Sequence, residues 1–453
     1  MGLDRARLAR LFRLFLLVNA IGIGVALGVW LYGQEIQAIS GLRLQLSQSL
    51  PRVLVLPVMG LGAGAIAGAL ISGVEPSAGG SGIVQVLLYL RGAAIPMGWR
   101  VALVKLLASG IAIGGGLPVG PEGPSIQIGA SVARETASAL GHRGRPLLPV
   151  AIGSGAGLAA IFHAPLGGVA YILEELLGRL DSRVHAMAAF ATFMAVAWTR
   201  LLCDGGSGPL LWRNLRPVID YPAANTNLRL IDLPLLLALG LVAGLLAPLY
   251  QAAIGQLRRR FGRWQRPAWQ LLPLVGLGIG LAYTLLPARF DDPEHLALDA
   301  MSDMANWPQA ILVLAVQAIG TAIAVAADAP GGFLAPALVV GASLGSLLQQ
   351  LSLALFHYAP SSLLFAGGAA FLGALTRTPL TAILLSFELS KNYTLLLPIG
   401  FCVLTAIAVA DLLQRHTLFD AMVADAERAA AEPTGIGQSA EKLGPKVGRR
   451  KPS

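Results

Sequence analysis

The stretch Gly120-Pro-Glu-Gly-Pro-Ser-Ile-Gln-Ile-Gly-Ala-Ser131 places a carboxylate in a part of the chain that is almost free of charge. Within residues 101–133 only Lys105 and Glu122 are ionisable. Glycine and proline flank the glutamate on both sides. Because proline suits the first turn of a helix, the spacing predicts a helix that begins near Pro124, after a bent segment with accessible amides.

The overall composition indicates which solvent surrounds this stretch. Of 453 residues, 55% are hydrophobic and 13% are charged, whereas soluble domains carry about 25% charged residues. Apolar runs long enough to cross a bilayer recur along the chain, for example at 14–33, 53–73 and 394–413. The composition predicts an all-α polytopic membrane protein.

The formal net charge of +9 does not indicate a nucleic-acid-binding surface. The basic residues cluster at the ends of apolar segments, at 5–13, 258–266 and 446–451. This distribution follows the positive-inside rule and predicts that both termini and the loop near residue 260 are cytoplasmic. The first apolar run lacks a small-residue cleavage site, so we expect a retained helix rather than a signal peptide.

The two halves of the chain resemble each other at an offset of about 215 residues. Four pairs of segments match in order: 20–32 with 238–250, 56–64 with 272–280, 124–131 with 336–343, and 164–174 with 378–388. Duplicated transporters bind their substrate where the two repeats meet. If each half has an odd number of crossings, the repeats are inverted.

The repeat suggests five segments. They are a cytoplasmic N-terminal segment (1–13), a first transmembrane repeat (14–203), a connecting loop (204–231), a second transmembrane repeat (232–425) and a short, disordered cytoplasmic tail (426–453).

Three glycine-rich loops each precede an apolar run, at 79–83, 120–124 and 330–336. Non-helical backbone at membrane depth is tolerated only where it is buried or lines a cavity. A helix N-terminus at such a place offers free N–H groups and a partial positive charge, which together bind an anion. The alternative is that glycine only allows helices to approach closely, as we expect for Gly60, Gly64 and Gly68.

These loops resemble three signatures of the CLC family of chloride channels and proton-coupled chloride antiporters. Gly80-Ser-Gly-Ile-Val84, Gly120-Pro-Glu-Gly-Pro124 and Gly332-Phe-Leu-Ala-Pro336 are similar to the family patterns GSGIP, G(K/R)EGP and GxFxP. Further similarity lies around Glu174-Glu175 and around Glu388, and together these segments span most of residues 15–425. The tail is too short for regulatory CBS domains, so we expect the bacterial type and no nucleotide.

The resemblance implies an inverted-repeat bundle of tilted and broken helices, a homodimer, and voltage- or proton-linked chloride transport, most simply antiport of chloride against protons. Glu122 would be the gating glutamate and external proton acceptor, and Glu175 the internal proton-transfer residue. The anion-binding residues implied are Gly80, Ser81, Gly82, Ile83, Gly120, Gly123, Gly332, Phe333, Leu334 and Phe419.

The adjacent acidic residues Glu174 and Glu175 are expected to differ in role, since neighbours on a helix point about 100° apart. Glu174 has a repeat counterpart, Glu388, which favours a shared structural task such as binding loop N–H groups. Glu175 corresponds to Leu389 and has no acidic counterpart.

The chain departs from the family pattern at four positions. Val84 replaces a proline, Pro121 replaces a basic residue, Phe419 replaces a tyrosine whose hydroxyl contacts the anion, and Asp328 adds a carboxylate beside the third loop. The first and third changes are expected to loosen the anion site. The second and fourth are expected to make its surroundings less positive.

Three alternatives to antiport remain open. A passive chloride channel of the same fold is the strongest, and a fluoride/proton antiporter is weaker because Ser81 and the Glu-Gly-Pro triplet fit the chloride pattern. A membrane-embedded enzyme would need a catalytic or metal cluster, and Cys203, Cys402 and six histidines form none in the sequence. The expected partners are chloride, protons, the bilayer of a bacterial inner membrane and a second copy, with no cofactor, metal or nucleic acid.

Overall fold

The computed structural model describes residues 5–141, 146–177, 182–204, 228–264, 266–288 and 307–431. Every regular element in these ranges is helical, and the only extended pairing there is a single bridge between Gly120 and Gly332. Six of the helices are long and apolar enough to cross a bilayer. The prediction of an all-α polytopic membrane protein is confirmed.

The helices fall into two series along the chain. The first consists of α1 (Arg5–Ser49), α2 (Arg52–Gly73), η1 (Pro76–Ala78), α3 (Ile83–Leu90), α4 (Trp99–Gly114), α5 (Glu122–Ala139), α6 (Leu147–Phe162), α7 (Pro165–Tyr171), the π-helical segment η2 (Ile172–Leu177) and α8 (Ser182–Asp204). The second consists of α10 (Asp232–Arg263), α11 (Ala268–Tyr283), α13 (Trp307–Ala326), α14 (Leu334–Phe356), α15 (Ser362–Thr376), α16 (Pro379–Ser390), η5 (Tyr393–Leu395), α17 (Leu396–Leu413) and α18 (Leu418–Ala431).

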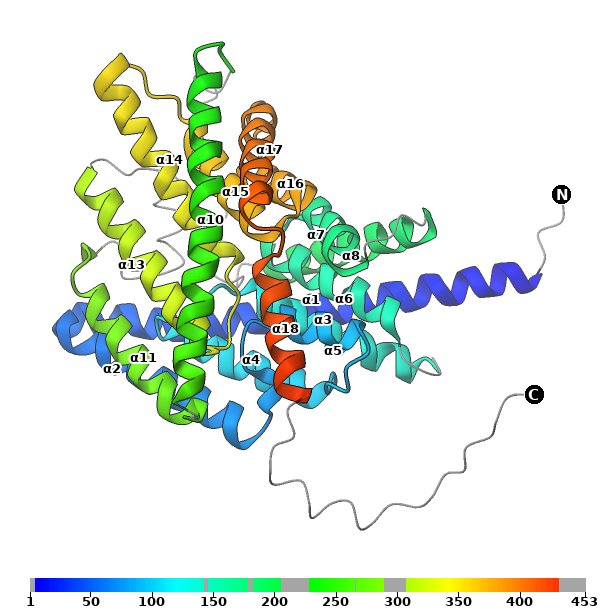
Figure 1. Ribbon diagram of the computed structural model, residues 1–453. Helices are drawn as coiled ribbons and strands as arrows, with labels where there is room; N and C mark the ends of the chain where they lie inside the picture. Colours follow the sequence, from blue (N-terminus) through cyan, green and yellow to red (C-terminus); the bar gives the residue numbers. More distant parts are fainter. Residues whose placement is uncertain are drawn as a thin grey trace.

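Helices α2 and α11, which the sequence repeat relates, lie side by side (Figure 1) and meet through glycine. A Cβ at Gly60 would overlap the carbonyl group of Gly276, and a Cβ at Gly276 would overlap that of Gly60. Gly64 meets Leu272 and Gly68 meets Ala268, so the two helices run antiparallel about this crossing. The expected close approach at the three glycines of α2 is confirmed.

The same relation holds where α5 packs on α6 and α14 packs on α15. Gly129 touches the backbone of Gly153, and its repeat counterpart Gly341 touches the backbone of Gly367. Helices α6 and α15 end at equivalent residues, His163 (φ 52°) and Arg377 (φ 60°), both in the left-handed conformation that closes a helix C-terminus. Equivalent elements thus make equivalent contacts in both halves.

The carboxylates of Glu174 and Glu388 bind helix N-termini in the opposite half of the molecule. Glu174 accepts hydrogen bonds from the amides of Leu380 (2.8 Å) and Thr381 (2.7 Å) at the start of α16. Glu388 accepts hydrogen bonds from the amides of Leu166 (3.0 Å) and Gly167 (2.8 Å) at the start of α7. This reciprocal capping confirms the predicted structural task of the two glutamates.

The ends of the predicted segments differ from the helices observed. Helix α1 already begins at Arg5, within the segment predicted to precede the first repeat, and α18 continues to Ala431, into the predicted tail. The helix continues there because residues 424–431 are rich in alanine, the strongest helix former. Most of the predicted connecting loop and the rest of the tail lie outside the described residues.

Candidate functional site

The first of the three predicted loops turns sharply between η1 and α3. Gly80 (φ 65°) and Gly82 (φ 90°) adopt backbone conformations that side chains with a Cβ disfavour. Helix α3 begins directly after this turn, at Ile83. Val84 therefore occupies the first helical turn, and the helix starts here without the proline of the family pattern.

Three polar side chains hold this loop in place. The buried Lys105 Nζ donates to the carbonyl oxygens of Ala78 (3.0 Å) and Gly80 (2.6 Å). Gln85 Oε1 accepts from the Gly82 amide (2.9 Å), and its Nε2 donates to the Gly79 carbonyl (2.7 Å). The sequence singled out Lys105 as an intramembrane cation but did not identify its partners, since backbone carbonyls distant in sequence leave no pattern.

Gln127 adds a third tie, through a bond from its Nε2 to the Ser77 carbonyl (2.8 Å). Because all three side chains use their polar groups on the loop backbone, the loop is fixed from three helices, α3, α4 and α5. The Ser81 hydroxyl takes no part in these contacts and has no hydrogen-bond partner among the described residues. It is buried, so an occupant that accepts a hydrogen bond would satisfy it.

The second and third loops are joined by backbone hydrogen bonds between repeat-equivalent glycines. The Gly120 amide donates to the Gly332 carbonyl (2.7 Å), and the Gly332 amide donates to the Gly120 carbonyl (2.6 Å). In this conformation the two amides are therefore not available to an anion. The amides of Gly80 and Gly82 are also engaged, the first with the Asp328 carbonyl (2.9 Å).

Glu122 reaches across this junction from the start of α5 to the start of α14. Its Oε1 accepts hydrogen bonds from the amides of Leu334 (2.7 Å) and Ala335 (3.3 Å). The residue is fully buried, and its Oε2 has no hydrogen-bond partner within the described part of the chain. The carboxylate thus occupies the helix N-terminus of the opposite repeat, which is the kind of place where an anion binds.

The remaining predicted anion-binding residues surround this carboxylate. The amides of Ile83, Gly123 and Phe333 donate no backbone or side-chain hydrogen bond within the described residues. A Cβ at Gly123 would overlap the Ser81 carbonyl oxygen, so the first and second loops are in direct contact. The structure therefore brings all three loops together, as the resemblance implied.

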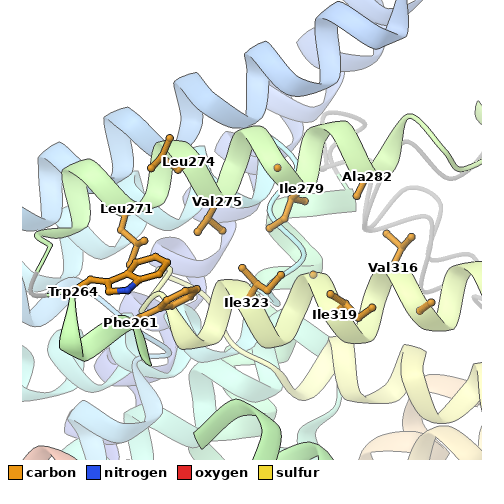
Figure 2. A pocket seen from close by; sticks show the side chains of 13 residues that line it. Phe261, Trp264, Leu271, Leu274, Val275, Ile279, Ala282, Val316, Ile319 and Ile323 are labelled. Carbon is orange, nitrogen blue, oxygen red and sulfur yellow. The ribbon is translucent and has the colours of Figure 1, made fainter. Parts of the chain in front are cut away.

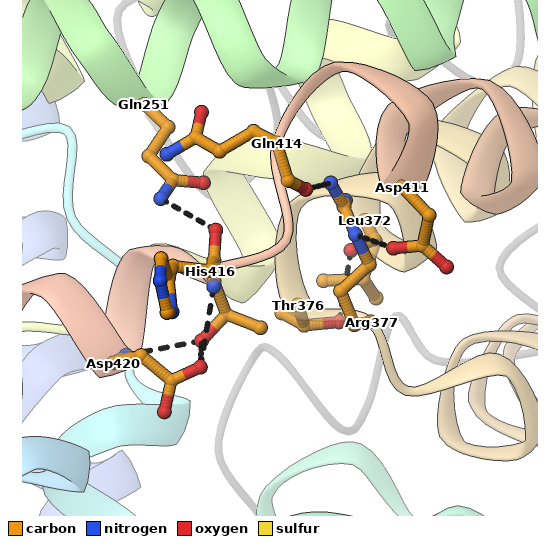
Figure 3. Close-up of polar contacts among 9 residues, drawn as sticks. Gln251, Leu372, Thr376, Arg377, Asp411, Gln414, His416 and Asp420 are labelled. Carbon is orange, nitrogen blue, oxygen red and sulfur yellow. Dashed lines mark hydrogen bonds and ion pairs between the residues drawn. The ribbon is translucent and has the colours of Figure 1, made fainter.

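Phe419 packs against the third loop, with its ring 4.7 Å from that of Phe333. The linker between α17 and α18 fixes its position (Figure 3). Gln251 Nε2 donates to the His416 carbonyl (2.9 Å), and Thr417 Oγ1 donates to Asp420 Oδ2 (2.9 Å) at the first turn of α18. Phe419 is buried and supplies a hydrophobic wall in place of a hydroxyl.

Glu175 lies on the π-helical segment η2, which is not one of the three loops. Its charged neighbours are Asp420, Arg91 and Glu174. Arg91 at the end of α3 and Asp420 on α18 form an ion pair of 3.3 Å. Glu122 and Glu175 therefore have different surroundings: the first binds the N-terminus of α14, and the second lies near an ion pair. The π-helical turn at Glu175 is of a kind that is frequent at functional positions.

Tyr171 is a residue that sequence reasoning missed. Its side chain is buried, and its hydroxyl has no hydrogen-bond partner among the described residues. This hydroxyl lies within electrostatic range of both Glu175 and Glu122. The only signal in the sequence is a polar atom on an aromatic residue four positions before Glu175, which on its own does not distinguish a functional tyrosine from a core tyrosine.

Asp328 has a counter-charge that the sequence did not reveal. Arg258 Nη1 on α10 lies 2.7 Å from Asp328 Oδ1. Asp328 adopts a left-handed conformation (φ 54°), and its carbonyl accepts the Gly80 amide. Its effect on the charge around the loops is therefore offset by Arg258. Among the described residues no group of three or more His, Cys, Asp or Glu side chains could hold a metal ion.

Comparison with known proteins agrees with this geometry. A family model described as voltage gated chloride channel matches residues 63–411. Among solved structures, a slow cyanobacterial Cl⁻/H⁺ antiporter is 27% identical, with a TM-score of 0.81 over 93% of this chain and 99% of that one.

Two further structures share the fold. A eukaryotic CLC transporter is 22% identical, with a TM-score of 0.76 over 92% of this chain and 74% of that one. A CLC-type fluoride/proton antiporter is 19% identical, with a TM-score of 0.72 over 93% of this chain and 99% of that one. Since the family model covers most of the sequence and the loops and helices follow the same plan, this chain belongs to the voltage gated chloride channel (CLC) family.

Proposed function

We propose that this multi-pass membrane protein exchanges chloride for protons, with Glu122 as both the gate and the external proton acceptor. The observation that carries the proposal is the position of the Glu122 carboxylate. It binds the Leu334 and Ala335 amides at the N-terminus of α14, where an anion of the pathway would bind. A single position is thus open either to the carboxylate or to chloride.

Competition for this position links the two ions. The ionised carboxylate holds the amides and excludes chloride, whereas a protonated side chain carries no charge to compete with it. Proton uptake at Glu122 therefore favours chloride entry, and chloride exit favours proton release. The Ser81 hydroxyl and the amides of Ile83 and Phe333 supply the remaining donors for chloride in this proposal.

The route of the proton would run from Glu175 to Glu122 past Tyr171. The Tyr171 hydroxyl is a buried polar group that interacts electrostatically with both carboxylates, and it has no competing hydrogen bond among the described residues. A hydroxyl both donates and accepts, so it can pass a proton on with the help of water. The ion pair of Arg91 and Asp420 lies next to Glu175 and would form the internal entrance.

The passive channel is the second candidate, favoured by the apolar wall at Phe419. A phenyl ring gives no hydrogen bond to a central anion, and weaker binding there would loosen the obligatory exchange of the two ions. Antiport is the better supported function because a passive pore needs no second acidic residue such as Glu175 and no polar group such as Tyr171 that interacts with both carboxylates. The similarity to the slow cyanobacterial Cl⁻/H⁺ antiporter, at 27% identity, supports the same choice.

The test is a paired flux measurement in liposomes that contain purified protein. A chloride gradient is imposed without a pH gradient, and chloride and protons are recorded together. We expect protons to move in the direction opposite to chloride, in step with it, and so to build up a pH gradient. Chloride movement without proton movement would refute antiport and support the passive channel. We also propose a homodimer in a bacterial inner membrane with both termini cytoplasmic, which cross-linking and tagged termini in intact cells would test.

A further inference from the structure

Two cavities adjoin each other at the basic end of α10. The first has a volume of about 450 Å³ and lies between α11, α13 and the last turns of α10 (Figure 2). Its lining is apolar throughout and includes Leu274, Ile279, Ile319 and Ile323. Leu274 and Ile319 are exposed on the surface of the helix bundle, so the cavity opens toward the lipid.

The second cavity has a volume of about 360 Å³ and, unlike the first, has charged residues in its lining. Arg258, Arg259 and Arg266 line it. It shares the lining residues Phe261 and Leu271 with the apolar cavity, so the two cavities adjoin at these side chains. We refer to the two adjoining cavities together as the groove, which has a basic end and an apolar part.

The basic end carries positive charge that the protein does not neutralise. The two acidic residues in the cavity each have a partner: Asp328 pairs with Arg258 (2.7 Å) and Asp425 with Arg428 (3.1 Å). For Arg259 and Arg266 the described part of the chain offers no ion pair and no side-chain hydrogen bond. Two guanidinium groups thus remain for an external anion.

Aromatic residues mark the boundary between the two parts. The rings of Phe261 and Trp264 lie 5.2 Å apart at the end of the apolar cavity that adjoins the arginines. Tryptophan is enriched at the level of lipid headgroups. The positive-inside distribution places this end of α10 at the cytoplasmic leaflet, whose lipids include anionic species.

We propose that this groove binds an anionic phospholipid, with the phosphate at Arg259 and Arg266 and an acyl chain in the apolar cavity. Guanidinium groups match phosphate oxygens in geometry and charge, and basic pockets between membrane helices recognise anionic headgroups. A free phosphate would use the arginines but not the apolar cavity. A neutral lipid would use the apolar cavity but leave both charges without a counter-ion.

The bound headgroup would lie close to the anion pathway. Arg258 lines the second cavity and holds Asp328, and the Asp328 carbonyl accepts the amide of Gly80 in the first loop. Only two contacts therefore separate the groove from the loop that carries Ser81. A phosphate that attracts Arg258 would weaken its contact with Asp328.

The test is native mass spectrometry of the purified full-length protein in neutral detergent. Dioleoylphosphatidylglycerol, dioleoylphosphatidylcholine and glycerol 1-phosphate are titrated separately. We expect phosphatidylglycerol to bind and the other two to bind about tenfold more weakly or not at all. Equal binding of phosphatidylcholine would overturn the proposed charge recognition, and equal binding of glycerol 1-phosphate would show a phosphate site instead of a lipid site.

Two variants locate the binding. R259Q/R266Q should lower the affinity for phosphatidylglycerol about tenfold, whereas the matched control R260Q/R263Q should not, because these exposed arginines of the same helix line neither cavity. Gly278→Leu should also weaken binding, since Gly278 lines the apolar cavity and a Cβ there meets no atom within 4 Å. Equal losses in R259Q/R266Q and in its control, or unchanged binding in Gly278→Leu, would overturn the proposal.

Discussion

Replacing Glu122 by glutamine removes the charge of the proposed gate and keeps the shape of its side chain. The glutamine Oε1 can still accept from the Leu334 and Ala335 amides. Its Nε2 takes the place of Oε2, which has no hydrogen-bond partner among the described residues, so no existing bond is lost. The variant therefore separates the effect of charge from that of packing.

The expected magnitude follows from these two bonds. A hydrogen bond to a charged group contributes about 1 kcal/mol more than a neutral one, which amounts to about 2 kcal/mol for both. The partial charge at the N-terminus of α14 adds up to about 1 kcal/mol for a carboxylate. The side chain of Glu122→Gln should therefore hold this position about 3 kcal/mol less strongly, which corresponds to roughly a hundredfold advantage for chloride.

Isothermal titration with chloride and the paired flux assay measure both consequences. Glu122→Gln should bind chloride more tightly, and its chloride flux should continue with no proton movement. Glu135→Gln is the matched control, because Glu135 lies on the same helix and pairs with Arg134 (2.5 Å) away from the loops. Proton movement coupled to chloride in Glu122→Gln, or the same change in the control, would refute the role of Glu122.

Glu175→Gln should keep chloride flux and abolish proton flux, since it removes the proposed internal proton donor but no group of the anion site; retained coupling would exclude that role. Tyr171→Phe loses only a hydroxyl, which has no hydrogen-bond partner among the described residues, so its melting temperature should stay within a few degrees of the wild-type value. Its proton flux should fall about tenfold. Unchanged proton flux would show that Tyr171 is not part of the proton route. Gly60→Ala should destabilise the protein by about 1–3 kcal/mol, because the added Cβ overlaps the Gly276 carbonyl. Gly62→Ala, which has open space around its Cβ, should be neutral or stabilising. Equal melting temperatures for the two variants would contradict the close crossing of α2 and α11.

Much of the architecture could be predicted from the sequence because duplication leaves a trace in it. The repeat offset anticipated which elements would be equivalent, and the reciprocal capping by Glu174 and Glu388 follows that equivalence. The three glycine-rich loops could be found for a similar reason. Glycine and proline mark bends at positions where a continuous helix would otherwise be expected.

Contacts between groups that are distant in the sequence could not be predicted, because they leave no local sequence pattern. Lys105 binds carbonyl oxygens 25 to 27 residues away, and Arg258 pairs with Asp328 from another helix. Backbone carbonyls carry no residue type, and an arginine in a basic cluster does not reveal which acid it meets. The hydrogen bond between the Gly120 amide and the Gly332 carbonyl could likewise not be predicted. A glycine indicates that the backbone can bend, but it does not indicate which group the backbone amide will bind.

The asymmetry of the site depends on the symmetry of the scaffold around it. Repeat-equivalent glycines, Gly120 and Gly332, bring each loop to the start of the opposite helix, so either half could in principle send a side chain across. Only the first half has a carboxylate there, since the position equivalent to Glu122 is Leu334, and the Leu334 amide receives that carboxylate. The N-terminus of α14 is therefore occupied by the protein, while the Gly123 amide at the start of α5 has no acceptor in the described chain. The difference between Glu122 and Leu334 thus leaves one helix N-terminus occupied by a carboxylate of the protein and the other without one.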